Sequence, residues 1–378
     1  MESRIWLSSP HMGGTEQKYI NQAFEENWIA PLGPNVSGFE QDLEQYLGND
    51  SHVACVSSGT GAIHIALDMA GVSTDDTVLC QSFTFCGSAN PIIYRGATPI
   101  FIDSEMDTWN MSPAYLRKAI QQELEKGKKP KAVIAVHLYG MPAKIDEIAQ
   151  ICKEHNIVLI EDAAEALGSE YKGRKCGTFG DFSILSFNGN KIITTSGGGA
   201  LVCRSKKEKE QAIFLATQAR DAAPHYQHTR VGYNYRMSNI VAGIGRGQME
   251  VLDAHVKLRR ENHDFYHNFF NNIEGVTVFE EPSSEYFSNH WLSCITFHND
   301  NEMLNCEKLR NFLLEFNIES RPLWKPMHLQ PVYASAVYYG NGEAERLFKY
   351  GLCLPSGSNL TVEEKERINK ALQVFFKR

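Results

Sequence analysis

The sequence lacks the long apolar runs of a membrane protein. No apolar stretch in its 378 residues approaches the length that a helix needs to cross a bilayer. The first residues, MESRIWLSSPHMGG, also lack the continuous apolar core of a secretory signal. We therefore expect a cytoplasmic protein with no membrane partner.

The nine cysteines are not arranged as a metal site or a disulfide framework. They include no CxxC pair, and several fall inside apolar, strand-like runs. An odd number of scattered cysteines is typical of reduced core thiols. The sequence thus predicts no metal site.

The chain also has no excess of basic residues. Its 37 Lys and Arg against 45 Asp and Glu give a net charge of -8, which disfavours a nucleic-acid partner but allows a local basic pocket for a small phosphorylated ligand. There are no repeats or low-complexity segments. Because the length exceeds that of a usual single domain, we expect a large and a smaller domain, at residues 1–250 and 251–378.

What the sequence does contain is a regular alternation of short apolar strands and helical segments. Strands are predicted at residues 52–56, 77–80, 98–103, 131–140, 156–166, 182–187 and 200–204, with helices between most of them. This pattern indicates an α/β fold with a mostly parallel sheet covered on both faces, and ligands bind such sheets at the carboxyl ends of the strands.

The remaining segments indicate a smaller α+β part. A long loop at 218–239 is of a length typical of functional or interfacial segments. It leads into a long helical pattern from 238 to about 273. A strand at 291–297, a helix at 306–316, a strand at 318–321 and a final helix at 362–376 are predicted beyond it.

Residues 186–199, SFNGNKIITTSGGG, place Lys191 among small, polar and glycine residues directly after a strand. An amine in such a pocket can be nucleophilic and form a Schiff base. From this stretch alone, a lysine in a simple strand-end turn is an equal alternative.

Two further strand ends carry polar groups. The run SSGTGA, residues 57–62, precedes a helix and could bind phosphate through its backbone N–H groups, although turn and capping roles also explain it. Glu161 and Asp162 end another strand, where a carboxylate can hold a protonated ring nitrogen. A phosphate site, a carboxylate and a lysine together are what pyridoxal 5'-phosphate requires.

Several runs carry a resemblance to a known family: SSGTGAIHIAL, SFTF, VHLYG, IEDAAEALGS, GTFGDFSILSFNGNK and GYNYRMSN. They are similar to the DegT/DnrJ/EryC1/StrS nucleotide-sugar aminotransferases, over nearly the whole chain. The resemblance implies the fold-type I architecture of aspartate-aminotransferase-like enzymes. PHMGG, NWIAPLG and NGNKIITTSGGG look most like the branch that makes UDP-4-amino sugars for bacillosamine.

The resemblance also implies roles for individual residues. Lys191 would attach pyridoxal 5'-phosphate covalently and then move protons, and Asp162 would pair with the ring nitrogen. The other cofactor-binding residues would be Gly59, Thr60, Phe85, Glu165, Ser186 and, from the second subunit of a homodimer, Asn234. The substrate would contact Asn188, Arg321, Lys325 and His328.

Glu165 departs from the commoner glutamine beside the phenolic oxygen of the cofactor, and its role stays open. A carboxylate there must share a proton with that oxygen or repel it. SGGG in place of the frequent GEGG removes an acidic group near Lys191.

The resulting hypothesis is a transaminase that uses glutamate to aminate UDP-2-acetamido-4-keto-6-deoxyglucose, cycling through pyridoxamine 5'-phosphate. A dTDP- or GDP-linked keto sugar is an alternative substrate, and a non-catalytic cofactor-binding regulator is an alternative class. A related dehydratase is disfavoured because Lys191 is present, and a Rossmann dehydrogenase is disfavoured because no GxGxxG follows the first strand.

Overall fold

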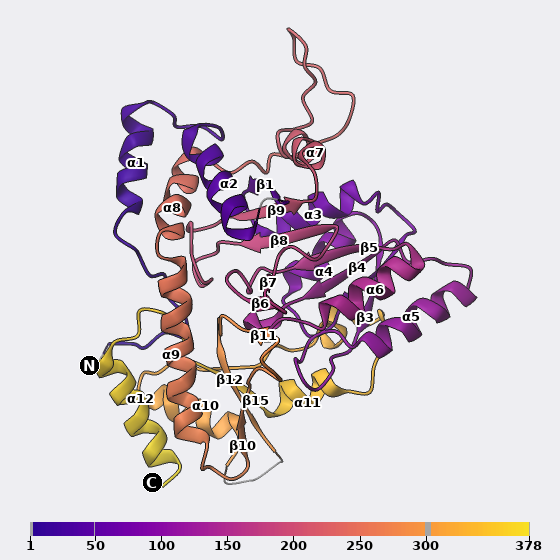
Figure 1. Cartoon of the computed structure of the whole chain (residues 1–378). Coiled ribbons are helices and arrows are strands. Elements are labelled where there is room, and N and C mark those ends of the chain that lie inside the picture. The colour runs from indigo at the N-terminus through magenta and orange to yellow at the C-terminus, as the bar shows by residue number, and fades with distance from the viewer. Residues whose placement is uncertain (1–2, 49, 299–303, 378) are drawn as a thin grey trace.

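The structure is a computed structural model that describes residues 3–48, 50–298 and 304–377. Its centre is an eight-stranded sheet in the order β1-β9-β8-β5-β4-β2-β3-β14, in which β9 runs against its neighbours and the other strands share one direction (Figure 1). The predicted mostly parallel sheet is therefore confirmed. The strands are β1 (His52–Val56), β2 (Thr77–Gln81), β3 (Thr98–Ile102), β4 (Ala132–Val136), β5 (Val158–Asp162), β8 (Phe182–Ser186), β9 (Gly199–Cys203) and β14 (Val337–Tyr339).

Helices cover both faces of this sheet, because successive side chains of each strand point to opposite faces. On β1, Ala54 and Val56 pack into the core formed with α3, α4 and α7, whereas Val53 and Cys55 pack into the core formed with α2 and α8. Further along the second face, α5 and α6 cover the sheet. The helices are α2 (Pro34–Leu47), α3 (Gly59–Met69), α4 (Cys86–Tyr94), α5 (Pro113–Glu125), α6 (Ile145–His155), α7 (Lys206–Ala216) and α8 (Asn239–Met249).

The long helix predicted from 238 to 273 is two helices, α8 and α9 (Leu252–Phe270). Val251 between them departs from helical geometry, with φ -117° and ψ 4°. Neither Glu250 nor Val251 is a glycine or proline, so the sequence gives no signal of the break. In Figure 1 the two helices follow each other along one side of the molecule and connect the large sheet to the smaller part.

The smaller part contains a four-stranded antiparallel sheet covered by α9, α10 and α12. The strand predicted at 318–321 is only partly present, because Ile318 instead forms a bridge with Ile5 of the N-terminal segment. The remaining elements are β10 (Val276–Val278), β12 (Ser293–Phe297), β13 (Arg321–Pro322), β15 (Gly351–Leu354), α10 (Cys306–Glu315), α11 (Glu343–Tyr350), α12 (Val362–Phe375), α1 (Glu16–Glu25) and the small sheet of β6 (Glu170–Tyr171), β7 (Arg174–Lys175) and β11 (Tyr286–Phe287). Short 3-10 turns lie at Leu138–Gly140, Met327–Leu329 and Pro331–Tyr333.

Two segments cross the predicted domain boundary at residue 250. Ile5 packs in the core of the smaller part, and β14 lies at the edge of the large sheet. The division at this residue stays a prediction. Among the described residues, no helix is both long and apolar enough to cross a membrane.

Candidate active site

A cavity of about 570 Å³ lies where the parallel strands of the large sheet end. Asp162 and Ser186 are the last residues of β5 and β8, and α3 begins shortly after the end of β1. Because these strands are parallel, their carboxyl ends meet at one edge. The predicted site residues that line this cavity are Gly59, Thr60, Phe85, Asp162, Glu165, Ser186, Asn188, Lys191 and Arg321.

Lys191 directs its amine into this cavity. Its backbone N–H donates to the Asn188 carbonyl at 3.0 Å, which forms the turn after β8. Its Nζ lies 3.0 Å from Oε1 of Glu165 and 4.0 Å from the centre of the Trp291 ring, and the side chain is 12% exposed. Lys191 is therefore not a solvated lysine in a simple strand-end turn.

Glu165 links this amine to the turn that follows β4. Its Oε2 accepts the backbone N–H of Tyr139 at 2.8 Å, while Oε1 accepts from Lys191. Burial raises the pKa of the Glu165 carboxyl, and the nearby Lys191 charge opposes that shift. Tyr139 adopts a positive φ of 56°, an uncommon conformation for a residue with a side chain.

Asp162 is buried and accepts two hydrogen bonds. Ser88 Oγ donates to its Oδ2 at 2.6 Å, and the Ala164 N–H donates to its Oδ1 at 3.1 Å. Burial raises the pKa of Asp162, and the hydrogen bonds from Ser88 and Ala164 act in the opposite direction. Sequence analysis did not identify Ser88, because a serine in the first turn of a helix is common and gives no signal of its partner.

The start of α3 forms an open anion site. Ser58 caps the helix by accepting the Gly61 N–H at 3.0 Å, while the N–H groups of Gly59 and Thr60 have no hydrogen-bond partner within the described residues. A Cβ on Gly199 would lie 2.4 Å from Gly59 N, so only glycine lets β9 approach this turn so closely. Free N–H groups at a helix N-terminus bind phosphate.

Aromatic side chains form much of the remaining wall. Phe85 is 58% exposed on the cavity side of α4, with its ring centre 5.7 Å from that of Trp324. Trp6 and Trp291 also line the cavity. These three tryptophans were not identified from the sequence. Trp291 falls in a predicted strand, where an apolar residue is expected in the core.

Three predicted residues lie outside this cavity. Asn234 is exposed within the long loop of residues 218–239, and Lys325 is exposed beyond β13. Both ring nitrogens of His328 have partners, with Nδ1 2.6 Å from Ser82 Oγ and Nε2 3.2 Å from Glu345 Oε1. Arg321 does line the cavity, and it also pairs with Glu319 at 2.7 Å.

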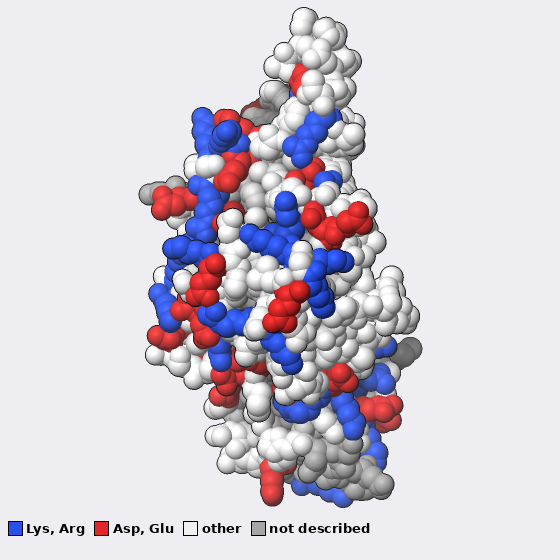
Figure 2. Space-filling model, turned by 90° about the vertical axis from the view of Figure 1, so that its right-hand side faces the viewer, with Lys and Arg blue, Asp and Glu red and all other residues white. Residues whose placement is uncertain are grey.

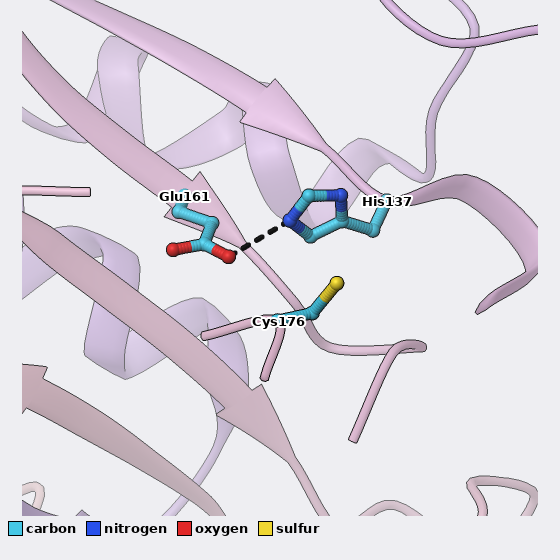
Figure 3. Close-up of side chains that lie close together, drawn as sticks. All are labelled: His137, Glu161 and Cys176. Atoms are coloured by element: carbon cyan, nitrogen blue, oxygen red, sulfur yellow. Dashed lines mark hydrogen bonds and ion pairs between the residues drawn. The ribbon is translucent and has the colours of Figure 1, made fainter. Parts of the chain in front are cut away.

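A buried group of His137, Glu161 and Cys176 lies beside the site and has the residue types of a metal centre (Figure 3). The Ala143 N–H donates to His137 Nδ1 at 2.9 Å, so the imidazole proton is on Nε2, which donates to Glu161 at 2.8 Å. Burial raises the pKa of the Cys176 thiol, which disfavours the thiolate that a metal requires.

Glu161 is fully occupied by hydrogen bonds. Besides His137, it accepts from Ser183 Oγ at 2.8 Å and from the backbone N–H groups of Gly177, Phe179 and Gly180 at 2.5, 2.6 and 2.9 Å. Burial raises the pKa of Glu161, but the hydrogen bonds from His137, Gly177 and Gly180 outweigh it and hold the pKa of this carboxyl below its usual value. The group therefore holds together the ends of β4 and β5, next to Asp162.

Comparison with known proteins decides the family. The model of the DegT/DnrJ/EryC1/StrS aminotransferase family matches residues 10–373. The chain belongs to this family. This membership confirms the predicted aminotransferase class and the fold-type I architecture.

Individual members of the family show the extent of the similarity. EpsN of Bacillus subtilis (strain 168), named as a candidate pyridoxal phosphate-dependent aminotransferase, is 51% identical over 100% of this chain and 97% of its own length. GDP-perosamine synthase of Escherichia coli O157:H7 is 37% identical over 98% of each chain. The crystal structure of a family aminotransferase from Brucella abortus has a TM-score of 0.89 at 27% identity, covering 96% of this chain and 95% of that one.

Proposed function

We propose that the protein transfers an amino group from glutamate to a UDP-linked 4-keto-6-deoxy sugar. Family membership places it among the aminotransferases that act on nucleotide-linked keto sugars with pyridoxal 5'-phosphate. The observation that carries the proposal is the meeting of Lys191, Glu165 and Asp162 in one cavity beside the open start of α3.

These residues fit the cofactor. The free N–H groups of Gly59 and Thr60, with the nearby Ser186 hydroxyl, provide a phosphate site. Asp162 provides a buried carboxylate for the ring nitrogen, and Phe85 provides an exposed ring for stacking. When bound, pyridoxal 5'-phosphate supplies an electron sink and carries the amino group as its pyridoxamine form.

The chain's own groups then have separate tasks. Asp162 keeps a proton on the ring nitrogen by its negative charge. Lys191 provides the amine for covalent attachment and the base that moves protons. Glu165 holds that amine in place through its Oε1, and the rings of Trp291 and Trp324 form apolar parts of the cavity wall.

The nucleotide remains the open part of the proposal. The motif resemblance favours UDP, whereas the 37% identity to GDP-perosamine synthase favours GDP as the second candidate. Incubation with glutamate and matched UDP-, GDP- and dTDP-linked 4-keto sugars, with the products followed by NMR, separates them. We expect the UDP sugar to give the highest kcat/KM. A kcat/KM at least tenfold higher for the GDP sugar, a difference of about 1.4 kcal/mol, would reject the UDP assignment.

A homodimer with shared sites would account for the position of Asn234 outside the cavity. The segment before Asn234 projects from the body of the molecule (Figure 1), and the end of this projection has few charges (Figure 2). Tyr226 and Val231 in it are 82% and 83% exposed, and exposed apolar side chains on a projecting segment suit contact with another protein surface. We assign this projection to contact with a second subunit, where Asn234 would approach the phosphate site.

A further inference from the structure

Arg259 of α9 is a buried cation directly behind the cavity wall. Its side chain is 1% exposed, and its Nε has no hydrogen-bond partner within the described residues. Burial alone lowers the pKa of its guanidinium to about 9, with no carboxylate opposing the shift. Burying a cation without a counter-ion is unfavourable, so a neutral side chain would suit a purely packing role better.

The guanidinium instead binds oxygen atoms from four separate segments. Nη1 donates to the carbonyls of Trp291 at 2.5 Å and Ser356 at 3.3 Å, and Nη2 donates to Ser8 Oγ at 2.9 Å and the Lys191 carbonyl at 3.4 Å. Ser8, Lys191 and Trp291 all line the cavity. Arg259 therefore connects three parts of the cavity wall without entering the cavity.

These contacts form part of a closed network around the peptide that precedes Lys191. The Asn190 carbonyl accepts from Ser8 Oγ at 2.8 Å and from Trp291 Nε1 at 2.6 Å. The ring of Trp291 in turn lies 4.0 Å from Lys191 Nζ. Removal of the guanidinium would leave the carbonyls of Lys191 and Trp291 without this donor, and the Ser8 hydroxyl would be held only by its bond to the Asn190 carbonyl within the described residues.

We propose that Arg259 is a positioning residue for Lys191. It fixes the backbone on which the amine is carried and the tryptophan ring against which the amine packs, so that Nζ stays in the cavity beside Glu165. The proposal rests on the function proposed above, in which Lys191 attaches the cofactor by condensing with its aldehyde and releasing water.

The test compares covalent attachment of pyridoxal 5'-phosphate with non-covalent binding of an analogue that has the same ring but no aldehyde. Apo forms of the wild type, Arg259→Met and Arg259→Lys are mixed with pyridoxal 5'-phosphate, and attachment is followed by absorbance. Binding of 4-deoxypyridoxine 5'-phosphate is measured by titration calorimetry on the same samples. Arg260→Met is the matched control, because Arg260 is the next residue of α9 and pairs with Glu281 at 2.6 Å rather than with the cavity wall.

We expect Arg259→Met to slow attachment about tenfold or more, since small displacements of a reacting group are costly, while the analogue binds within about threefold of wild type. Arg259→Lys should recover part of the rate, because its single nitrogen cannot serve all the acceptors. The control should match the wild type in both measurements.

Attachment at the wild-type rate in folded Arg259→Met overturns the proposal, as does an equal loss of attachment and analogue binding. If circular dichroism shows that Arg259→Met is unfolded, the Arg259→Lys variant decides. Slowed attachment with normal analogue binding in that variant supports the proposal, and attachment at the wild-type rate overturns it. Failure of the wild type to bind either compound would instead refute the proposed function.

Discussion

Ser88 determines how readily Asp162 keeps its negative charge. Its hydroxyl donates to the Asp162 carboxylate at 2.6 Å and opposes the upward pKa shift that burial causes. In Ser88→Ala the pKa of Asp162 should rise further, because the hydrogen bond from Ser88 that stabilises the carboxylate is lost. The carboxylate is then protonated at higher pH than in the wild type.

The expected result for Ser88→Ala is an acid limb displaced to higher pH in the rate profile of the glutamate half-reaction. Stopped-flow absorbance over a range of pH measures this limb. Ser73→Ala is the control, because among the residues that the structure describes its hydroxyl bonds only to Asp76, in a distant loop. An acid limb at the same pH in Ser88→Ala and wild type would show that Asp162 does not set it.

At this scale the strand and helix pattern predicted only residues at strand ends or before a helix, whereas Arg321, which also lines the cavity, was predicted from the family resemblance. Asp162 and Lys191 are visible because polar groups follow apolar strands. Trp291 precedes β12 and lines the cavity, and Arg259 of α9 lies behind the cavity wall; they are 100 and 68 residues beyond Lys191 in the chain. No local pattern encodes such contacts, so these residues could not have been assigned from periodicity.

At the scale of elements, the approach of β9 to the start of α3 depends on Gly199. A Cβ at this position would lie 2.4 Å from Gly59 N and Ser58 C, whereas a Cβ on Gly197 would meet nothing within 4 Å. Gly199→Ala should therefore destabilise the apo protein by about 2 kcal/mol, the usual cost of overpacking. Because the added methyl displaces the start of α3, binding of pyridoxal 5'-phosphate should also weaken at least about tenfold. Gly197→Ala should be close to wild type.

Urea unfolding and cofactor titration of both glycine variants check this prediction. Equal behaviour of the two variants would mean that the turn adjusts without cost, and that the phosphate site does not depend on this close packing.

The ends of β4 and β5 depend on the ionised state of Glu161. The pKa of this carboxyl is held below its ordinary 4.5, so its stabilising contribution is complete above pH 4.5 and is lost as the pH falls through the lowered pKa. Glu161→Gln should lower the free energy of unfolding by about 1.5 to 3 kcal/mol at pH 7, because hydrogen bonds to a charged group are lost, and by less at pH 3.

Urea unfolding of the apo protein at the two pH values measures the effect. Glu154→Gln is the control, because Glu154 lies on the surface with Arg117 and its loss should change little. A difference between Glu161→Gln and wild type that does not shrink with falling pH would contradict the linkage.

Most elements of the large sheet were predicted with bounds within a few residues, because alternating strands and helices leave a strong apolar pattern. The short strands β13 and β14 were not predicted as such. β14 has an exposed first residue and is held in the sheet only by pairing with β3, and β13 spans Arg321–Pro322, which gives no periodicity to detect. Tertiary pairing, rather than local preference, forms these strands.

At the scale of the whole molecule, we predict that a complete cofactor site needs residues from two subunits. A dimer assembled from one Lys191→Ala subunit and one Asn234→Ala subunit has one site with both defects and one with neither. It should recover about half of the wild-type activity per dimer, although each homodimer is inactive or strongly impaired. Purification through two different affinity tags isolates the mixed dimer.

If Asn234 acts within its own subunit, each site of the mixed dimer carries one defect. Activity no higher than the average of the two homodimers would then be found, and the shared site would be rejected.

The central claim is that Lys191 is the amine through which this cavity performs amino transfer. The most direct measurement is the half-reaction: the protein loaded with pyridoxal 5'-phosphate is mixed with glutamate, and loss of the absorbance band is followed together with release of 2-oxoglutarate. We predict stoichiometric conversion in the wild type, and a rate at least about 10³-fold lower in a folded Lys191→Ala variant. Unchanged absorbance in the wild type, or conversion at a similar rate in Lys191→Ala, would contradict the claim.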